Sequence, residues 1–184
     1  MGLFQWIKRL FTGAREAPYR VSPFPPGTGP SSLIVLRHSE KTGDKRDPHL
    51  SLSGRRRAEQ LVNYIPTTFG PPQFLVAART SNRSRRPVET LEPLAAALAL
   101  EIQSKIADDD SDELIETLRE KQRYRGKIGV ICWRHSELPE LLQALGAAPE
   151  TFPPNWDEND YTTIIDVTFA GNGEARAKRL QMPF

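Results

Sequence analysis

The sequence predicts an α/β domain, a three-layer α/β/α sandwich around a mostly parallel sheet. Short apolar runs rich in β-branched residues alternate along the chain with segments whose apolar residues have helical spacing. This order favours parallel strands joined by helices. The tetrapeptide Arg-His-Ser-Glu directly follows two of the runs, beginning at Arg37 and at Arg134. Because the carboxyl ends of parallel strands share one edge, where ligands usually bind, we expect both histidines to meet there.

Length and composition fit one domain preceded by an arm. With 184 residues, of which 38% are hydrophobic, the chain is long enough for one core. We expect the domain to span residues 31–184, after an N-terminal arm and a linker rich in Pro and Gly at residues 1–30. The net charge of +2 gives no reason to expect a nucleic-acid partner. Cys132 is the only cysteine, so no intramolecular disulfide can form, which predicts a cytoplasmic protein.

The arm begins with an amphipathic segment at residues 1–11. Apolar and aromatic residues dominate it, together with Lys8 and Arg9, and it is far shorter than the roughly 20 residues that span a bilayer. One interpretation is a helix that makes weak, peripheral contact with a membrane surface. The alternative is a helix that docks on its own domain, as short apolar helices usually do.

In the first half of the domain, the sequence predicts two strands and two helices. Residues 33–36 are continuously apolar, which is typical of a buried strand. Apolar residues at helical spacing then follow residues 52–54, and we expect Pro66 to end that helix. Residues 74–77 predict the second strand. Residues 86–100 predict a helix in which Pro93 implies a kink or a late start.

The second half continues the alternation. Residues 101–106 predict a short strand, and the acidic stretch after it opens a helix that ends near Gly126. Residues 128–133 predict a buried strand, followed by a helix over residues 137–145 that Gly146 closes. Residues 161–169 predict the last strand.

Three blocks of the sequence resemble the histidine phosphatase superfamily, the phosphoglycerate mutase-like group. The first covers residues 36–41 and continues with residues 47–51 and Gly54. In the second block, Arg86 precedes Thr90 by four residues on a predicted helix. The third, residues 130–141, combines a strand, the second histidine and a helix. The likeness covers about residues 33–169 and implies the phosphoglycerate mutase-like fold.

The resemblance implies a metal-independent phosphohydrolase without a cofactor. His38 is the implied nucleophile toward a phosphomonoester or a protein phosphohistidine, and it would form a phosphohistidine intermediate. Arg37 and Arg86 are implied to bind the phosphate oxygens, and His135, if protonated, to donate a further hydrogen bond. The implied partner is a phosphorylated small molecule or a phosphoprotein. The two serines that follow the histidines either contact the substrate or cap the next helix; they are Ser39 and Ser136.

The residue that protonates the leaving group is open. The superfamily usually employs a carboxylate, and the candidates here are those of the acidic stretch, chiefly Asp108, Asp110 and Glu113, together with Asp109 and Asp112. Asp110 and Glu113 also have the spacing of a helix capping box. The chain departs from the family pattern at Ser39 and Arg134, where glycine is common. A catalytically weak phosphate-binding or scaffold protein of the same fold is therefore the alternative function.

Other polar residues suggest further hypotheses. Arg83 and Arg85 are candidates for binding a second anionic group of the substrate, and we expect His49 at the rim of the site. A metal site formed by both histidines and a carboxylate is a third hypothesis. The nearby arginines argue against it, because fixed cations repel a metal ion. Mutase activity is a further option within the phosphohydrolase class.

Overall fold

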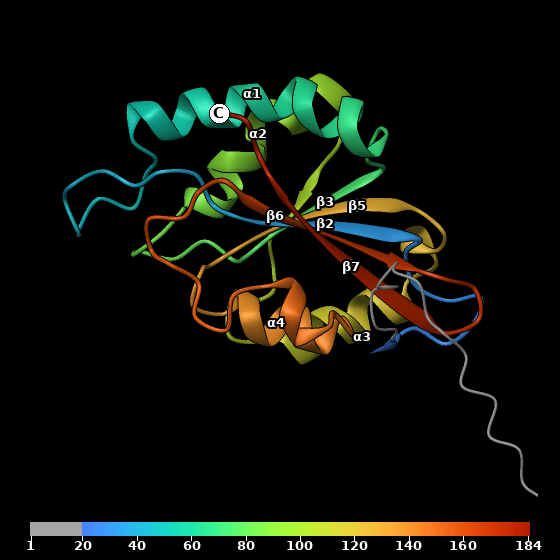
Figure 1. Cartoon of the computed structure of the whole chain (residues 1–184). Helices are drawn as coiled ribbons and strands as arrows, with labels where there is room; N and C mark the ends of the chain where they lie inside the picture. The colour runs from blue at the N-terminus through green and yellow to red at the C-terminus, as the bar shows by residue number, and fades with distance from the viewer. Residues whose placement is uncertain (1–19) are drawn as a thin grey trace, which may run out of the picture.

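The computed structural model describes residues 20–184 (Figure 1). The predicted amphipathic segment at residues 1–11 lies outside them, so both of its interpretations stay open. The elements, with η for a 3-10 helix, are β1 (Arg20–Val21), β2 (Ser32–Arg37), α1 (Leu52–Phe69), β3 (Phe74–Ala77), α2 (Arg86–Leu98), β4 (Ile102–Gln103), α3 (Ser111–Glu120), η1 (Gln122–Tyr124), β5 (Ile128–Trp133), α4 (Leu138–Ala144), η2 (Pro149–Thr151), β6 (Thr163–Phe169) and β7 (Glu174–Gln181).

Helices cover both faces of a single sheet, so the three-layer prediction is confirmed. Helices α1 and α2 lie on one face, and α3 and α4 lie on the other (Figure 1). Successive residues of β2 alternate between the two cores, because side chains along a strand point to opposite faces. Leu33 and Val35 pack in the core under α3 and α4, whereas Ile34 and Leu36 pack under α1 and α2. This double burial explains why the strand reads as an uninterrupted apolar run.

The sheet has the strand order β1-β7-β6-β2-β5-β3-β4. Strands β2, β5, β3 and β4 are parallel, whereas β6, β7 and β1 are antiparallel to their neighbours. A mostly parallel sheet therefore describes the half that holds β2 to β5 and fits the whole only loosely. The sequence did not reveal β7, because its residues alternate between small buried side chains and exposed charged ones instead of forming an apolar run.

Several predicted boundaries were wrong, and the causes are local. Helix α1 continues past Pro66 to Phe69. A proline near the end of a helix costs only one backbone hydrogen bond, and the Pro66 carbonyl still accepts the Gly70 N–H at 3.1 Å. Helix α2 contains Pro93 and begins at Arg86, so it does not start late. The strand expected at residues 101–106 is only the two residues of β4. Helix α3 ends at Glu120, before the expected end near Gly126, and the 3-10 helix η1 follows it.

The described part of the predicted linker packs on the sheet. Strand β1 pairs with β7, and the Phe24 side chain is 3% exposed, with its ring edge-on to Phe169 at 4.8 Å between centroids. The domain boundary at residue 31 stays a prediction. In the described part of the chain, no helix combines the length and apolarity required to cross a membrane.

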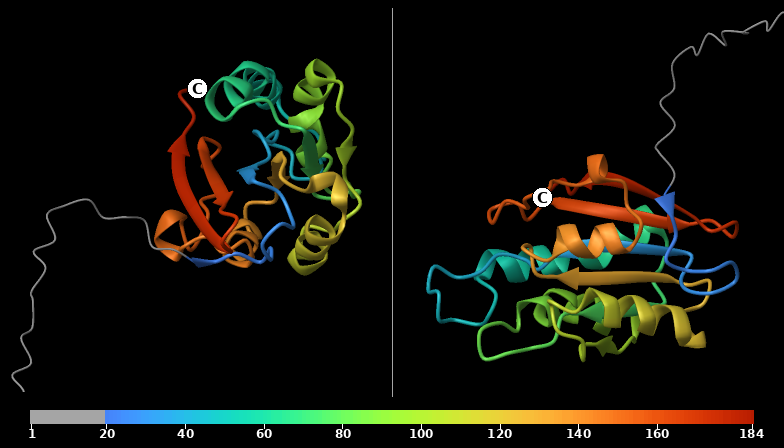
Figure 2. Two further views of the ribbon diagram at one scale, coloured as in Figure 1. Left: turned by 90° about the vertical axis from the view of Figure 1, so that its right-hand side faces the viewer. Right: turned by 90° about the horizontal axis from the view of Figure 1, so that it is seen from below.

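The loops that follow the parallel strands lie at one edge of the sheet. The loops after β2 and β3 extend from the same end of the sheet, on the left of Figure 1 and of the right-hand view in Figure 2. His38 follows β2 directly, Asp108 lies beyond β4, and His135 lies two residues beyond β5. The topology therefore predicts where the candidate side chains meet.

Candidate active site

A cavity of about 470 Å³ lies at this edge of the sheet. Its walls come from the loops after β2, β3, β4 and β5 and from the first turn of α2. The lining residues are Arg37, His38, Lys41, Ala78, Arg79, Ser81, Arg83, Ser84, Arg86, Pro87, Ala107, Asp108, Asp109, Arg134 and His135. All four predicted catalytic residues are among them.

His38 is buried and held as a neutral imidazole. Its ring is 4% exposed, and Nδ1–H donates to the Ser39 carbonyl at 2.7 Å. Burial, followed by the charges of Arg37, Arg86 and His135, lowers the pKa of His38 to about 3. Because Nδ1 carries the proton, Nε2 has the free lone pair. Arg37 and Arg86 lower the pKa of His38, as expected for cations near an imidazole, but burial is the larger cause.

Arg37 is 2% exposed and is only partly satisfied by the protein. Its Nη1 group donates to the backbone carbonyls of Asp157, Glu158 and Asp160 at 3.3, 2.5 and 3.4 Å, and its guanidinium lies 4.0 Å from the centre of the Tyr161 ring. Within residues 20–184, Nε and Nη2 have no hydrogen-bond partner although both are buried. Buried donors normally have partners, so these two N–H groups are candidate donors to a bound anion.

Arg86 approaches the cavity from the first turn of α2. Its Nη2 group donates to the Asp47 carbonyl at 2.7 Å, and Nε donates to the His49 carbonyl at 3.3 Å. These bonds fix the guanidinium against the wall. The His49 ring itself contacts the Glu89 carboxylate and is not among the residues that line the cavity.

Thr90 connects the His38 loop to helix α2. Its side chain is completely buried; Oγ1 accepts the Ser39 N–H at 2.9 Å and donates to the Arg86 carbonyl at 2.8 Å. The sequence identified the Arg86 and Thr90 pair but did not show what the threonine contacts. One hydroxyl thus positions both the backbone beside His38 and the backbone of Arg86.

The two predicted substrate-binding serines do not line the cavity. The Ser39 hydroxyl is buried without a described partner, and the Ser136 hydroxyl donates to the Glu137 carboxylate at 2.7 Å. Ser136 therefore bonds its neighbour, and Ser39 acts through its backbone. Neither placement supports contact with a substrate.

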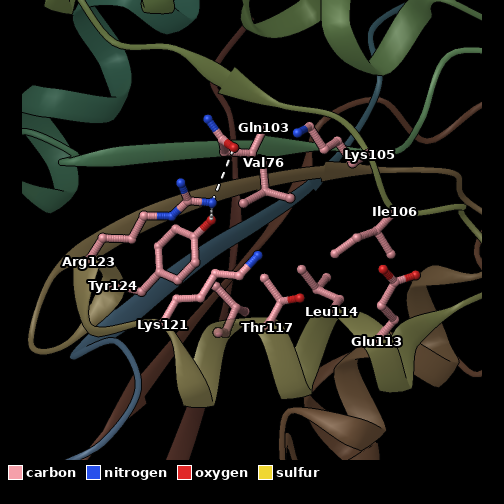
Figure 3. A pocket seen from close by; sticks show the side chains of 11 residues that line it. Val76, Gln103, Lys105, Ile106, Glu113, Leu114, Thr117, Lys121, Arg123 and Tyr124 are labelled. Carbon is pink, nitrogen blue, oxygen red and sulfur yellow. Dashed lines mark hydrogen bonds between the residues drawn. The ribbon is translucent and has the colours of Figure 1, made fainter.

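Of the candidate acids, Asp108 and Asp109 line the cavity, and Asp108 is the more buried of the two. The Asp108 backbone carbonyl accepts the Trp133 indole N–H at 2.7 Å, and its carboxylate lies 3.6 Å from Arg134. Asp110 caps α3, accepting the Glu113 N–H at 3.0 Å. Glu113 lies in a separate, smaller pocket of about 100 Å³ between α3 and β4 (Figure 3). The capping interpretation of Asp110 therefore matches the structure, and Glu113 faces away from His38.

His135 differs from the expectation of a protonated donor. Burial, together with the charges of Arg37, Lys41 and Arg134, lowers its pKa. Its Nδ1 atom is buried without a hydrogen-bond partner in the described part of the chain. Burial, reinforced by the surrounding cations, therefore favours the neutral ring.

Comparison with solved structures identifies the fold. The protein histidine phosphatase SixA complexed with tungstate matches with a TM-score of 0.57 and 13% identity, over 82% of this chain and 96% of that chain. Mycobacterial glucosyl-3-phosphoglycerate phosphatase with inorganic phosphate matches with a TM-score of 0.54 and 14% identity, over 84% and 97%. Phosphoglycerate mutase from Plasmodium falciparum gives 0.51 and 12%, over 85% and 91%.

This chain has the histidine phosphatase fold. No protein-family model and no curated protein sequence matches it. The fold implied by the three sequence blocks is thus confirmed, at an identity too low for sequence comparison to detect. Among residues 20–184 no group of three or more His, Cys, Asp or Glu side chains is placed to share a metal ion.

The first prediction concerns how much the Thr90 hydroxyl stabilises the fold. Thr90→Val keeps the shape of the side chain but leaves the buried Ser39 N–H without an acceptor, so the free energy of unfolding should fall by about 1–3 kcal/mol. Urea unfolding measures the difference. Thr90→Ser, which keeps the hydroxyl, is the matched control and should lose clearly less. Equal losses in both variants would mean that the methyl group, and not the hydrogen bond, matters.

The shifted pKa of His38 predicts a pH dependence of stability. A histidine titrates near 6.5 in an unfolded chain, and burial lowers the pKa of His38 to about 3 in the folded protein. Between these values the unfolded chain binds a proton that the folded protein does not, so stability falls as the pH drops from 6.5 toward 3. Urea unfolding of His38→Gln between pH 6.5 and 4.5 should show a shallower decrease than the parent protein. Parallel curves would contradict a buried neutral ring.

Proposed function

We propose that this protein is a metal-independent phosphohydrolase that uses His38 as a nucleophile on a phosphomonoester or on phosphohistidine in a protein. One observation carries the proposal. A neutral, buried His38 with its lone pair on Nε2 shares a cavity with Arg37, which has two buried N–H groups without a hydrogen-bond partner among residues 20–184. A nucleophile beside preorganised donors for a phosphoryl group is the arrangement that phosphoryl transfer requires.

The first step joins Nε2 of His38 to phosphorus and breaks the bond from phosphorus to the leaving oxygen. Arg37 and Arg86 bind the equatorial oxygens, whose charge they offset without a proton transfer. Water then attacks the phosphohistidine, the bond between phosphorus and nitrogen breaks, and His38 leaves as the neutral imidazole that its buried environment favours. Inorganic phosphate is the second product.

Asp108 is the residue that we propose for proton transfer. The departing oxygen needs a proton when it belongs to an alcohol, and a carboxylic acid at the cavity wall can supply it. The same carboxylate then accepts a proton from the attacking water. Asp108 and Asp109 both line the cavity with His38, and Asp108 is the more buried of the two, whereas Asp110 and Glu113 have other partners or face another pocket.

The structural neighbours support a phosphate-binding site. One of the similar structures holds tungstate and another holds inorganic phosphate, and both are tetrahedral oxyanions. The cationic cavity of this chain fits such a ligand. A cytoplasmic location is also part of the proposal, because Cys132 is the only cysteine of the chain and no intramolecular disulfide can form.

The first functional test is the hydrolysis of phenyl phosphate in the presence of a chelator. The purified protein should release phosphate, and His38→Ala should reduce the rate by roughly 10³-fold or more, because the nucleophile is lost. Arg56→Ala is a matched control on the exposed face of α1, outside the cavity, and should keep the parent rate.

The same assay separates the alternative function. No turnover by the parent protein, together with calorimetric binding of vanadate that Arg37→Ala abolishes, would favour a phosphate-binding or scaffold role. Turnover that disappears with the chelator would contradict the metal-independent mechanism.

A second functional test concerns Asp108. Asp108→Asn should lower kcat for an alkyl phosphate by about 10²-fold or more, because general acid catalysis contributes roughly 10²–10⁴ to such reactions. Hydrolysis of 4-nitrophenyl phosphate, whose leaving group needs no proton, should change much less. Steady-state kinetics on both substrates measures the contrast. If Asp109→Asn produces the contrast and Asp108→Asn does not, the acid is Asp109.

A further inference from the structure

The cavity has more cationic side chains than are needed to bind one phosphoryl group. Six of the fifteen lining residues are Lys or Arg and two are Asp, although the whole chain has a net charge of only +2. The volume of about 470 Å³ falls within the roughly 300–1,000 Å³ typical of sites for whole small molecules. A phosphate bound by Arg37, Arg86 and the histidines leaves a second, cationic part of the cavity unexplained.

The lining cations divide into those with protein partners and those without. Arg37 and Arg86 donate to backbone carbonyls, Lys41 pairs with Glu158 at 3.1 Å, and Arg134 lies 3.6 Å from Asp108. Within residues 20–184, the guanidinium groups of two other lining arginines form no hydrogen bond or ion pair. These two residues are Arg79 and Arg83.

The backbone that carries these two arginines is well held. The Arg79 N–H donates to the Ile106 carbonyl at 2.7 Å, which ties the residue to the segment before Asp108. Arg83 sits in a turn in which Ser81 and Ser84 exchange backbone hydrogen bonds of 2.9 and 3.3 Å. The Arg83 carbonyl also accepts from Arg86 Nη2 at 3.4 Å. The second cationic part of the cavity, at Arg79 and Arg83, thus lies next to Arg86, the arginine proposed to bind the phosphate.

We propose that Arg79 and Arg83 form a second anion subsite, so that the substrate is a small phosphomonoester with another anionic group, a carboxylate or a second phosphate. This inference rests on the proposed function of the cavity. Arg85, the other candidate from the sequence, lies outside the subsite: it does not line the cavity, and its Nε is 3.9 Å from the Glu89 carboxylate on its own helix. Guanidinium groups bind planar or tetrahedral oxyanions through paired N–H donors.

Two phosphonates that cannot be hydrolysed test the subsite without relying on turnover. Benzylphosphonate carries one anionic group, and 4-carboxybenzylphosphonate adds a carboxylate to the same frame. Calorimetry with the full chain should show that the carboxylated analogue binds roughly tenfold more tightly or better, the effect of hydrogen bonds between charged groups. In the double variant Arg79→Ala and Arg83→Ala, the ratio of the two dissociation constants should fall toward one.

Arg56→Ala is the matched control, because it removes the same charge from an exposed position of α1 outside the cavity. It should keep the full ratio. Repeating the comparison with the 3-carboxy isomer and with a bisphosphonate distinguishes a carboxylate from a second phosphate as the preferred group.

The outcomes separate this inference from the proposed function. Equal binding of both analogues by the parent protein overturns the second subsite and favours substrates with a single phosphoryl group, such as phosphohistidine in a protein. A tenfold preference that survives the double variant also overturns the assignment to Arg79 and Arg83. Failure of phenyl phosphate hydrolysis, by contrast, bears on the catalytic proposal alone, because the binding ratio does not require turnover.

Discussion

The site depends on the parallel pairing of β2 with β5. The two strands pair in register from Ser32 opposite Ile128 to Arg37 opposite Trp133, so the two copies of the repeated tetrapeptide begin beside each other, offset by one residue. The His38 N–H even continues the ladder by donating to the Trp133 carbonyl at 3.2 Å. A shift of one residue would turn every side chain of β2 to the opposite face. The two buried cores therefore fix the register that brings His38 and His135 to one cavity.

Burial then decides the chemistry of the groups placed there. A buried cation costs several kcal/mol unless the protein compensates for its lost hydration. Three carbonyls of the loop at residues 157–160 and the Tyr161 ring offset part of this cost for Arg37, whereas the imidazole of His38 stays neutral. Burial thus leaves a cation at Arg37 next to a neutral ring at His38.

Helix α1 supports the loop that follows His38. Arg57 donates to both carboxylate oxygens of Glu40, at 2.8 to 3.0 Å. A Cβ atom at Gly54 would lie 2.3 Å from the Glu40 carbonyl oxygen, so only glycine permits this close approach. The sequence offered no reason to single out Arg57 among three consecutive arginines, because the spacing along one helix does not show which of them faces another loop.

The sequence alone determined the fold class, the order of most elements and the edge of the sheet where His38, Arg86 and His135 belong. These follow from local patterns, namely apolar runs, helical spacing and motifs at strand ends. Tertiary structure decided which carboxylates share the cavity, that His135 favours its neutral form, and that Arg79 and Arg83 face the site while Ser39 and Ser136 do not. Burial and through-space contacts depend on segments far apart in the chain, such as residues 157–160 around Arg37, and no local pattern encodes that proximity.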